Sequence, residues 1–390
     1  MTVILPVGFL PLIDAAPLII AAELGFAEAE GLRLDLKRAA SWSMLRDMLD
    51  FRQVDAAQML SVVPVAKALG LGGGVNDLEA PMVLCLNGQV VGVSQALAAE
   101  MRENANTFDF CDAVAAGRAL AGVGRALRIG VPFPFSMHAE LLHYWLDGLR
   151  LSVPDGTVIR TVPPPRMAEA LAAGEIDAFC VGEPWGSQAV EQAGAELLLP
   201  GSAIWSQAPE KVLATRAGWC EAQPDIAGRL IRCLWRAARW LAQPENRTTA
   251  SEVLVRQGFL DVSSDLIDRA LAGRIVVARG GIDHRVPQFL EFHRGAANFP
   301  WRSQAAWIGA RLAARHGLDV DHAMTLARAT FRSDLYRHHL GPEGADLPLA
   351  SDKSEGSLEA STAVPAVRGT LILARNRFFD GKIFDPDPDA

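Results

Sequence analysis

Short apolar runs alternate with helix-spaced segments along the first half of the chain. Apolar runs of about four to eight residues are typical of strands buried on both faces, and apolar residues three or four apart are typical of amphipathic helices. The expected strands are Val3–Val7, Leu32–Leu36, Ala56–Leu60, Pro81–Leu86, Val90–Ser94, Leu127–Val131, Thr157–Val162, Ala178–Val181, Leu197–Leu199 and Val212–Thr215. The expected helices are Ala15–Leu24 (capped by Asp14), Trp42–Phe51 (capped by Ser41), a helix opened by Ser61, Ala113–Leu120, Met137–Leu149, Pro164–Ala173 and Trp185–Ala193. Such alternation predicts mostly parallel sheets with helical crossovers.

Helical spacing dominates after the strand Val212–Thr215. The expected helices are Pro224–Ala242, Thr248–Gln257, Ser263–Ala272, Pro287–Arg294, Ser303–His316 and Asp319–Tyr336. Residues 341–368 are rich in Pro, Ser, Gly, Asp and Glu and lack periodicity, which predicts a flexible linker. Residues 369–390 are expected to form a C-terminal tail with one strand.

This order of elements predicts an α/β protein with two lobes, a ligand cleft and a C-terminal helical extension. Lobe I is expected to begin with residues 1–86, lobe II to comprise 87–203, and residues 204–340 to return to lobe I and form the extension. The chain would cross between the lobes near Cys85–Gly92 and again near Pro200–Val212. Ligands of such proteins bind between the lobes, at the carboxyl ends of strands.

The stretch Asp177–Trp185 marks one such strand end. Gly182 permits a tight turn after the buried strand, and Pro184 suits the first turn of a helix. A helix N-terminus offers backbone N–H groups and a partial positive charge, which favours a small anion. The alternative is an ordinary strand-to-helix turn without a ligand.

Composition and charge limit the classes of function. The chain has 390 residues, of which 50% are hydrophobic, and a formal net charge of -8, so direct nucleic-acid binding is not favoured. Its 5 cysteines are scattered singly, which indicates buried free thiols and no zinc site. Met1 leads straight into a strand without a signal peptide, so we expect a cytoplasmic protein if Met1 is the native start; the alternative is a chain trimmed of its leader.

No set of residues predicts an enzyme. Motifs of the GxSxG, HExxH and P-loop types are missing from the sequence, and the glycines at Gly70–Gly74 and Gly122–Gly124 lack the strand–turn–helix context of a dinucleotide site. We expect a binding protein with no catalytic residue, no cofactor and no metal. An interaction module without a ligand is a further alternative.

Several motifs resemble those of the solute-binding family of nitrate, nitrite and bicarbonate ABC transporters. They are Gly8–Pro17, Ala40–Trp42, Asn87–Gln89, Tyr144–Leu146, Val162–Met167, Asp177–Trp185, Pro209–Lys211 and Asn298–Trp301, in order along the chain. The resemblance implies a class II periplasmic-binding-protein fold. Since no leader precedes Thr2, the chain resembles most the cytosolic nitrate/nitrite sensors of the NasS type, which implies an RNA-binding antiterminator partner of the NasT type. The alternative is the solute-binding component of an ABC transporter, with membrane subunits as its partners.

The same resemblance implies a site for nitrate or nitrite at Trp42, Gln89, His138 and Lys211. Lysine would supply the charge, and the indole, amide and imidazole would supply neutral donors. Where the family has glycines before the histidine, this chain has Phe135-Ser136-Met137, which places backbone contacts there in question. Residues expected to support the site are Gly88, Glu183, Pro184 and Trp185.

Each of these residues also has an ordinary structural interpretation. Lys211 would be a surface lysine paired with Glu210, and His138 and Trp42 would be packing residues. Gln89 would lie in a hairpin at the Asn-Gly turn that precedes it. Glu183 carries a charge that repels nitrate, so we expect it to cap a helix or to pair with Lys211 or an arginine between the lobes.

Overall fold

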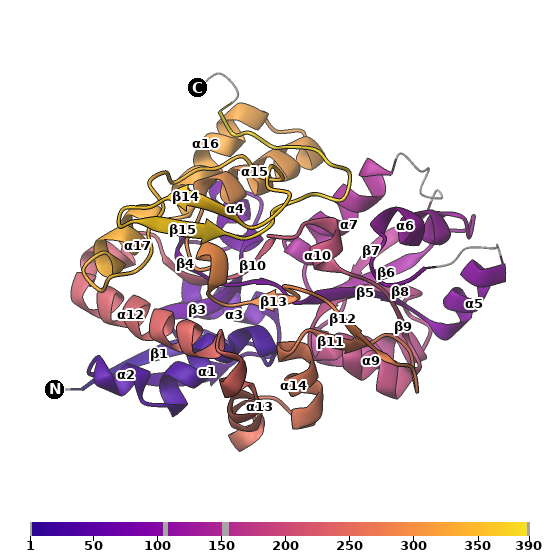
Figure 1. Cartoon of the computed structure of the whole chain (residues 1–390), viewed down its shortest axis with the longest axis horizontal. Coiled ribbons are helices and arrows are strands. Elements are labelled where there is room, and N and C mark those ends of the chain that lie inside the picture. The colour runs from indigo at the N-terminus through magenta and orange to yellow at the C-terminus, as the bar shows by residue number, and fades with distance from the viewer. Residues whose placement is uncertain (1, 104–107, 150–155, 388–390) are drawn as a thin grey trace.

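Two separate sheets form the centre of the computed structural model, which describes residues 2–103, 108–149 and 156–387 (Figure 1). The first sheet has the order β13-β4-β10-β3-β1-β2, and the second has the order β7-β6-β8-β5-β9. We call the parts of the molecule built on them lobe I and lobe II. The predicted two-lobed α/β fold is confirmed, while the residue boundaries of the lobes stay predictions.

The two sheets share one topology. In lobe I, β1 is parallel to β2 and β3, and β10 lies antiparallel between β3 and β4. In lobe II, β6 is parallel to β7 and β8, and β5 lies antiparallel between β8 and β9. The strands of lobe I are β1 Val3–Phe9, β2 Leu32–Arg38, β3 Ala56–Leu60, β4 Leu78–Asn87, β10 Pro209–Arg216 and β13 Leu290–Glu291. Those of lobe II are β5 Gln89–Val93, β6 Arg128–Val131, β7 Val158–Thr161, β8 Ala178–Gly182 and β9 Glu196–Pro200.

Helices cover both faces of each sheet, as the alternating pattern predicts (Figure 1). In lobe I, α1 packs on α12, and α4 packs on α15 and α16. The helices of lobe I are α1 Ala16–Glu23, α2 Phe26–Ala29, α3 Trp42–Asp50, α4 Val62–Ala68, α11 Trp219–Ala222, α12 Pro224–Leu241, α13 Arg247–Val255, α14 Ser264–Leu271, α15 Arg302–His316, α16 Val320–Thr330 and α17 Ser333–Leu340. Those of lobe II are α5 Gln95–Glu103, α6 Ala113–Ala121, α7 Met137–Gly148, α8 Met167–Ala172, α9 Trp185–Ala193 and α10 Gly201–Ile204.

The Asn87-Gly88 pair connects the two sheets. Asn87 has φ 57° and Gly88 has φ 93°, so both lie in the left-handed region that glycine adopts without strain. The preceding strand, β4, belongs to lobe I, and the following strand, β5, belongs to lobe II. The hairpin interpretation of this pair is therefore wrong, and the predicted crossing near Cys85–Gly92 is confirmed.

Several predicted helices differ from the observed elements. Residues 287–294 contain the short strand β13, which pairs with β4, in place of a helix. The helix expected over 319–336 is divided into α16 and α17, because Phe331 is extended and forms a bridge with Ala80.

The segment 341–368 differs from the predicted flexible linker. Its residues Thr362–Pro365 form β14, which pairs with β15 (Thr370–Leu373) in a separate two-stranded ladder. Glu355 is fully buried and accepts hydrogen bonds from Ser303 Oγ at 2.7 Å and Asn376 Nδ2 at 2.7 Å. Contacts with residues far away in the sequence hold this segment in an ordered conformation. The local composition of the segment does not indicate these contacts.

Candidate functional site

Lys211 lies fully buried on β10, the strand that enters lobe I between β3 and β4. Its Nζ atom lies 2.8 Å from Asp14 Oδ2 and 2.8 Å from Glu210 Oε1. The strand register is irregular on both sides of Lys211, and this irregularity lets the adjacent residues Glu210 and Lys211 join one cluster. The structural interpretation of Lys211 is therefore right about its pair with Glu210 and wrong about a position on the surface.

Trp42 packs beside this ammonium group. Ser41 accepts a hydrogen bond from the Met44 amide and so caps α3 at the residue before Trp42, as predicted. The centre of the indole ring lies 5.2 Å from Lys211 Nζ, within the range of a cation–π contact. The indole Nε1 is buried and has no hydrogen-bond partner in the described part of the chain.

His138 enters the same cluster from lobe II, in the first turn of α7. Ser136 caps that helix by accepting a hydrogen bond from the Ala139 amide at 3.2 Å. The Nδ1 atom of His138 lies 3.2 Å from Glu210 Oε1, but neither ring nitrogen has a hydrogen bond of acceptable geometry. Burial and the charge of Lys211 place the pKa of His138 well below its usual value, so the imidazole is neutral.

Gln89 begins β5, directly opposite Gly182 of β8. Its side chain is fully buried against Gly201, where an added Cβ would lie 2.6 Å from Gln89 Cδ. Both Nε2 and Oε1 of Gln89 lack a hydrogen-bond partner among the residues that the structure describes. The amide therefore keeps its full hydrogen-bonding capacity inside the protein.

Gly182 is tightly packed where the two lobes meet. A Cβ at this position would lie 2.9 Å from Leu12 Cδ2, 3.6 Å from Asp14 Oδ2 and 3.7 Å from His138 Nε2. Residues directly opposite in an antiparallel pair project to the same face, so Gln89 faces the same side as this position. The structure therefore brings the predicted residues Trp42, His138 and Lys211 together and places Gln89 at the edge of the same region.

The site contains an unusual concentration of buried polar atoms without partners. A buried donor or acceptor left unsatisfied costs about 1–3 kcal/mol, and native proteins retain few of them. Those of this region are Trp42 Nε1, Gln89 Nε2 and Oε1, His138 Nδ1 and Nε2, and Glu210 Oε2. A small polar ligand would pair with several of these donors and acceptors.

Burial determines the charge states of the acidic groups. It raises the pKa of Asp14, although Lys211 and Gln58 oppose the rise. It also raises the pKa of Glu210 to about 7, despite the attraction of Lys211. Burial alone would lower the pKa of Lys211, but attraction by Asp14 and Glu210 raises it above the ordinary value, so this side chain stays cationic.

The residues expected to support the site connect the lobes instead of binding an anion at the helix end. The Ile13 amide donates to the Glu183 carbonyl at 3.1 Å, and Trp185 Nε1 donates to the Pro11 carbonyl at 2.9 Å. The Glu183 amide donates to the Gly88 carbonyl at 3.0 Å. The bonds made by Ile13 and Trp185 therefore join lobe I to lobe II.

Glu183 fulfils the predicted capping role. Its Oε2 accepts a hydrogen bond from the Ser187 amide at 3.1 Å, and Pro184 directly precedes the first residue of α9. The prediction that this helix end offers free N–H groups to an anion is therefore wrong for Ser187. Among the residues that the structure describes, Glu183 forms no ion pair with Lys211 or with an arginine, and Lys211 pairs with Asp14 and Glu210 instead.

Asp14 and Gln58 are members of the site that the sequence reasoning missed. Asp14 was expected to cap a helix, but it forms no cap and binds Lys211 and Gln58 Nε2. Gln58 Oε1 in turn accepts the Leu10 amide at 2.9 Å. A signal was present, because an aspartate inside the apolar run from Leu12 to Pro17 must be paired when it is buried. Phe135, one of the departures from the family glycines, packs against Phe133 and His316, away from this cluster.

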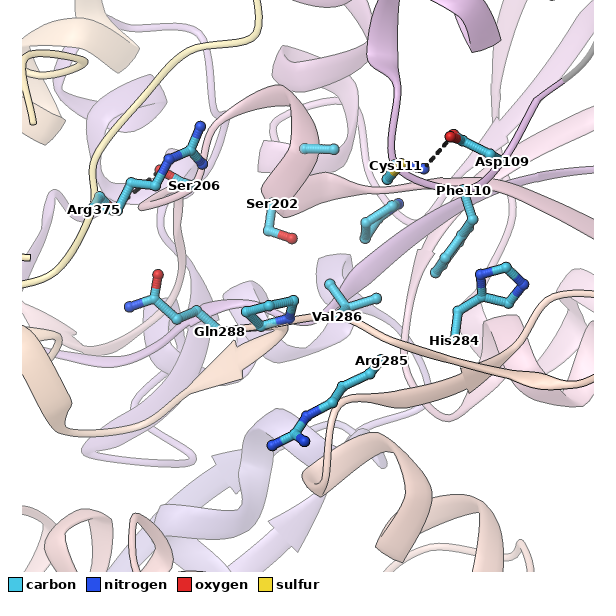
Figure 2. Close-up of a pocket in the computed structure, with 13 residues that line it drawn as sticks. Asp109, Phe110, Cys111, Ser202, Ser206, His284, Arg285, Val286, Gln288 and Arg375 are labelled. Carbon is cyan, nitrogen blue, oxygen red and sulfur yellow. Dashed lines mark hydrogen bonds between the residues drawn. The ribbon is translucent and has the colours of Figure 1, made fainter. Parts of the chain in front are cut away.

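A separate hollow of about 470 Å³ lies between α10, the segment from β12 (Asp283–Arg285) to β13, and the C-terminal chain (Figure 2). Phe110, Ser202 and Val286 are among the residues lining it, and none of the four predicted ligand residues is among them. In Figure 2 the Arg285 side chain extends away from Ser202 and Phe110. The unpartnered polar atoms around Lys211 make that buried cluster the stronger candidate for the binding site.

The described residues contain neither a metal site nor a membrane-spanning helix. No group of three or more His, Cys, Asp or Glu side chains among them is arranged to hold a metal ion. Within the same residues, no helix has the length and apolar character needed to cross a membrane. The expected buried thiols are found at Cys85, Cys180, Cys220 and Cys233, whereas Cys111 is exposed.

Comparisons with known proteins agree with this geometry. Residues 2–255 match the model of the NMT1-like family. The chain is 29% identical over 391 residues to the nitrate/nitrite binding protein NrtA of Nostoc sp. strain PCC 7120, covering 97% of this chain and 82% of that protein. It is 28% identical to the bicarbonate-binding protein CmpA of Synechococcus elongatus, covering 97% and 83% of the two chains. It spans only 45% of another relative, the nitrate import ATP-binding protein NrtC of Synechocystis sp. strain PCC 6803, at 30% identity over 79% of this chain.

The fold has a close counterpart among solved structures. The periplasmic nitrate-binding protein NrtA from Synechocystis PCC 6803 superposes with a TM-score of 0.84 at 24% identity, covering 99% of this chain and 96% of that one. This similarity confirms the periplasmic-binding-protein-like fold.

Proposed function

The chain belongs to the NMT1-like family of solute-binding proteins, which are not enzymes, and we propose that it binds a small oxyanion in the closed site around Lys211. Nitrate or nitrite is the preferred ligand, and bicarbonate is the alternative, since the relatives NrtA and CmpA bear those names. The observation that carries the proposal is the buried lysine beside the unpartnered indole of Trp42 and imidazole of His138, with the unpartnered amide of Gln89 at the edge of the same region.

The physical requirements of nitrate match these groups. A planar monoanion removed from water needs countercharge and several donors, because an unpaired buried charge is costly. Lys211 supplies the cation, and Trp42, Gln89 and His138 supply donors with no other partner. The planar indole of Trp42 also offers a surface on which a flat ion can stack.

A panel of anions tests the proposal on the purified protein. Thermal shift and isothermal calorimetry are measured with nitrate, nitrite, bicarbonate, sulfate and chloride. A ligand present at a hundred times its Kd stabilises the folded state by about 2.7 kcal/mol, so the bound ion should raise Tm clearly. Equal responses to all five ions, or none, would reject a selective oxyanion site.

The similarities favour a transport receptor over the cytosolic sensor that the sequence placed first. NrtA and NrtC are named for nitrate binding and nitrate import, so ABC transporter membrane subunits become the proposed partners. The sensor hypothesis, with a NasT-like antiterminator as partner and a cytoplasmic location, stays a prediction. A pull-down with such an antiterminator tests it, because the sensor must release its partner when nitrate or nitrite is added.

A further inference from the structure

Glu210 faces charged and titratable groups from four other elements. Asp14 reaches the cluster from the turn before α1, His138 from α7, Cys85 from β4 and Cys180 from β8, and Lys211 is its neighbour on β10. Burial raises the pKa of both thiols well above the usual value, so the thiols are neutral, as is His138. The charges that remain are those of Lys211, Asp14 and Glu210.

This balance is unfavourable for an incoming anion. With both carboxylates ionised, one lysine faces two negative groups, and the cluster carries a net charge of about -1 before any ligand enters, by the ordinary charges of these side chains. A monoanion would then add a second uncompensated charge in a buried site, where like charges repel strongly. One proton taken up by the cluster removes that excess.

The hydrogen bonds identify the carboxyl group that accepts this proton. Both oxygens of Asp14 have partners, since Oδ1 accepts from Gln58 and Oδ2 contacts Lys211. Glu210 has one partnered oxygen among the described residues, because Oε1 accepts from Lys211 while the buried Oε2 has no partner there. Protonation at Oε2 costs no existing hydrogen bond and converts an unsatisfied acceptor into a donor.

We propose that Glu210 takes up one proton when a hydrogen-free anion such as nitrate binds, and that it thereby determines which oxyanions the site accepts. This inference rests on the proposed function. Bicarbonate carries its own hydroxyl hydrogen and can donate it to an ionised Glu210, so its binding requires no added proton. The raised pKa of Glu210, about 7, places the coupling within an accessible pH range.

Calorimetry with nitrate in buffers of different ionisation enthalpy measures the proton directly. At pH 8, phosphate and Tris titrations should together show close to one proton taken up per nitrate, and uptake should fall toward zero at pH 6. Nitrate affinity should fall by about tenfold per pH unit above pH 7, as linkage of one proton requires. Uptake near zero in the wild-type protein at pH 8 would overturn the proposal.

Two variants assign the proton to its residue. Glu210→Gln keeps an oxygen for Lys211 and should bind nitrate without proton uptake and with a flat affinity between pH 6 and pH 8. Glu79→Gln is the matched control. Glu79, on β4, is also a buried carboxylate with a raised pKa, but it pairs with Arg332 at 2.6 Å instead of with Lys211. Uptake that persists in Glu210→Gln would assign the proton to another group and reject this role.

The outcomes separate the two proposals. Wild-type protein that gives no heat with nitrate, nitrite or bicarbonate fails the proposed function, and the role of Glu210 fails with it. Nitrate that binds with identical apparent enthalpy in both buffers rejects only the role of Glu210.

Discussion

Lys211 Nζ lies 2.8 Å from Asp14 Oδ2, so the cation expected to meet the ligand is already paired inside lobe I. Asp14 belongs to the turn that follows β1, and Lys211 belongs to β10, which enters lobe I after the whole of lobe II. The carboxylate holds the ammonium in place while His138 and Gln89 approach from the other lobe. A charge positioned in this way loses little side-chain entropy when the ligand binds.

Lys211→Met should abolish most anion binding and also destabilise the protein. Affinity should fall at least tenfold, or about 1.4 kcal/mol, because the only described cation in the cluster is removed. The free energy of unfolding should fall by about 3–5 kcal/mol, since Asp14 and Glu210 are left buried without a countercharge. Calorimetry measures the first effect and urea denaturation the second.

Lys67→Met is the matched control for that variant. Lys67 is also buried and pairs with Asp50 at 3.1 Å, but it lies on α4 and contacts the loop carbonyl of Gly73. This variant should lose comparable stability and keep its anion affinity. Equal losses of affinity in both variants would show that Lys211 acts through folding alone.

Gln89→Leu should separate binding from stability. The amide of Gln89 has no protein partner, so its replacement by an apolar side chain of similar size should leave the ligand-free protein equally stable or more stable by about 1 kcal/mol. Anion affinity should fall about tenfold, which calorimetry measures. A marked loss of unfolding free energy without ligand would indicate a structural role for the amide.

Glu183 should make stability depend on pH. Burial raises its pKa to about 7 from the ordinary 4.5, although the Ser187 hydrogen bonds oppose the rise. The folded state then holds a proton that the unfolded state has lost, so this group's stabilisation is complete below pH 4.5 and disappears as pH rises through about 7. Relative to Glu183→Gln, wild-type protein should lose unfolding free energy between pH 5 and pH 8 in denaturation series. A constant difference across this range would contradict the raised pKa.

Asn87 should tolerate glycine better than alanine. Its φ of 57° suits asparagine and glycine. Its Nδ2 atom donates a hydrogen bond to the Ser206 carbonyl at 2.8 Å, and this bond joins the two segments that cross between the lobes. Asn87→Gly loses only the hydrogen bond, worth about 1 kcal/mol. Asn87→Ala keeps a Cβ in the left-handed region but removes the short polar side chain that makes asparagine tolerated there, which adds about 1–2 kcal/mol. Denaturation of the two variants measures the difference, and equal losses would show that backbone conformation contributes nothing at this position.

Local patterns predicted most of the elements of the two lobes, whereas the family resemblance supplied Trp42, His138 and Lys211, which the structure brings together. The helix Trp185–Ala193 and the strand Ala56–Leu60 have the predicted bounds, because their apolar spacing and flanking residues are read within one segment. The helix predicted over residues 287–294 is wrong, because the pairing of Leu290 with Asn87 of β4 overrides the helical spacing of these residues. The helix-cap prediction for Asp14 is wrong for a related reason. The local sequence around a helix cap does not differ from that around a carboxylate that pairs with a lysine distant in sequence.

The pairing of Leu86 with Pro209 has a consequence for engineering. The chain leaves lobe I after β4 and re-enters it at β10 on the adjacent strand, so the two exit points are about one strand spacing, roughly 4.8 Å, apart. Topologically, lobe II is an insertion into the tip of a β-hairpin. A two-residue Asn-Gly turn could close that hairpin and leave lobe I as a continuous polypeptide. The same junction would accept a transplanted half from a receptor of different selectivity, or a fluorescent reporter.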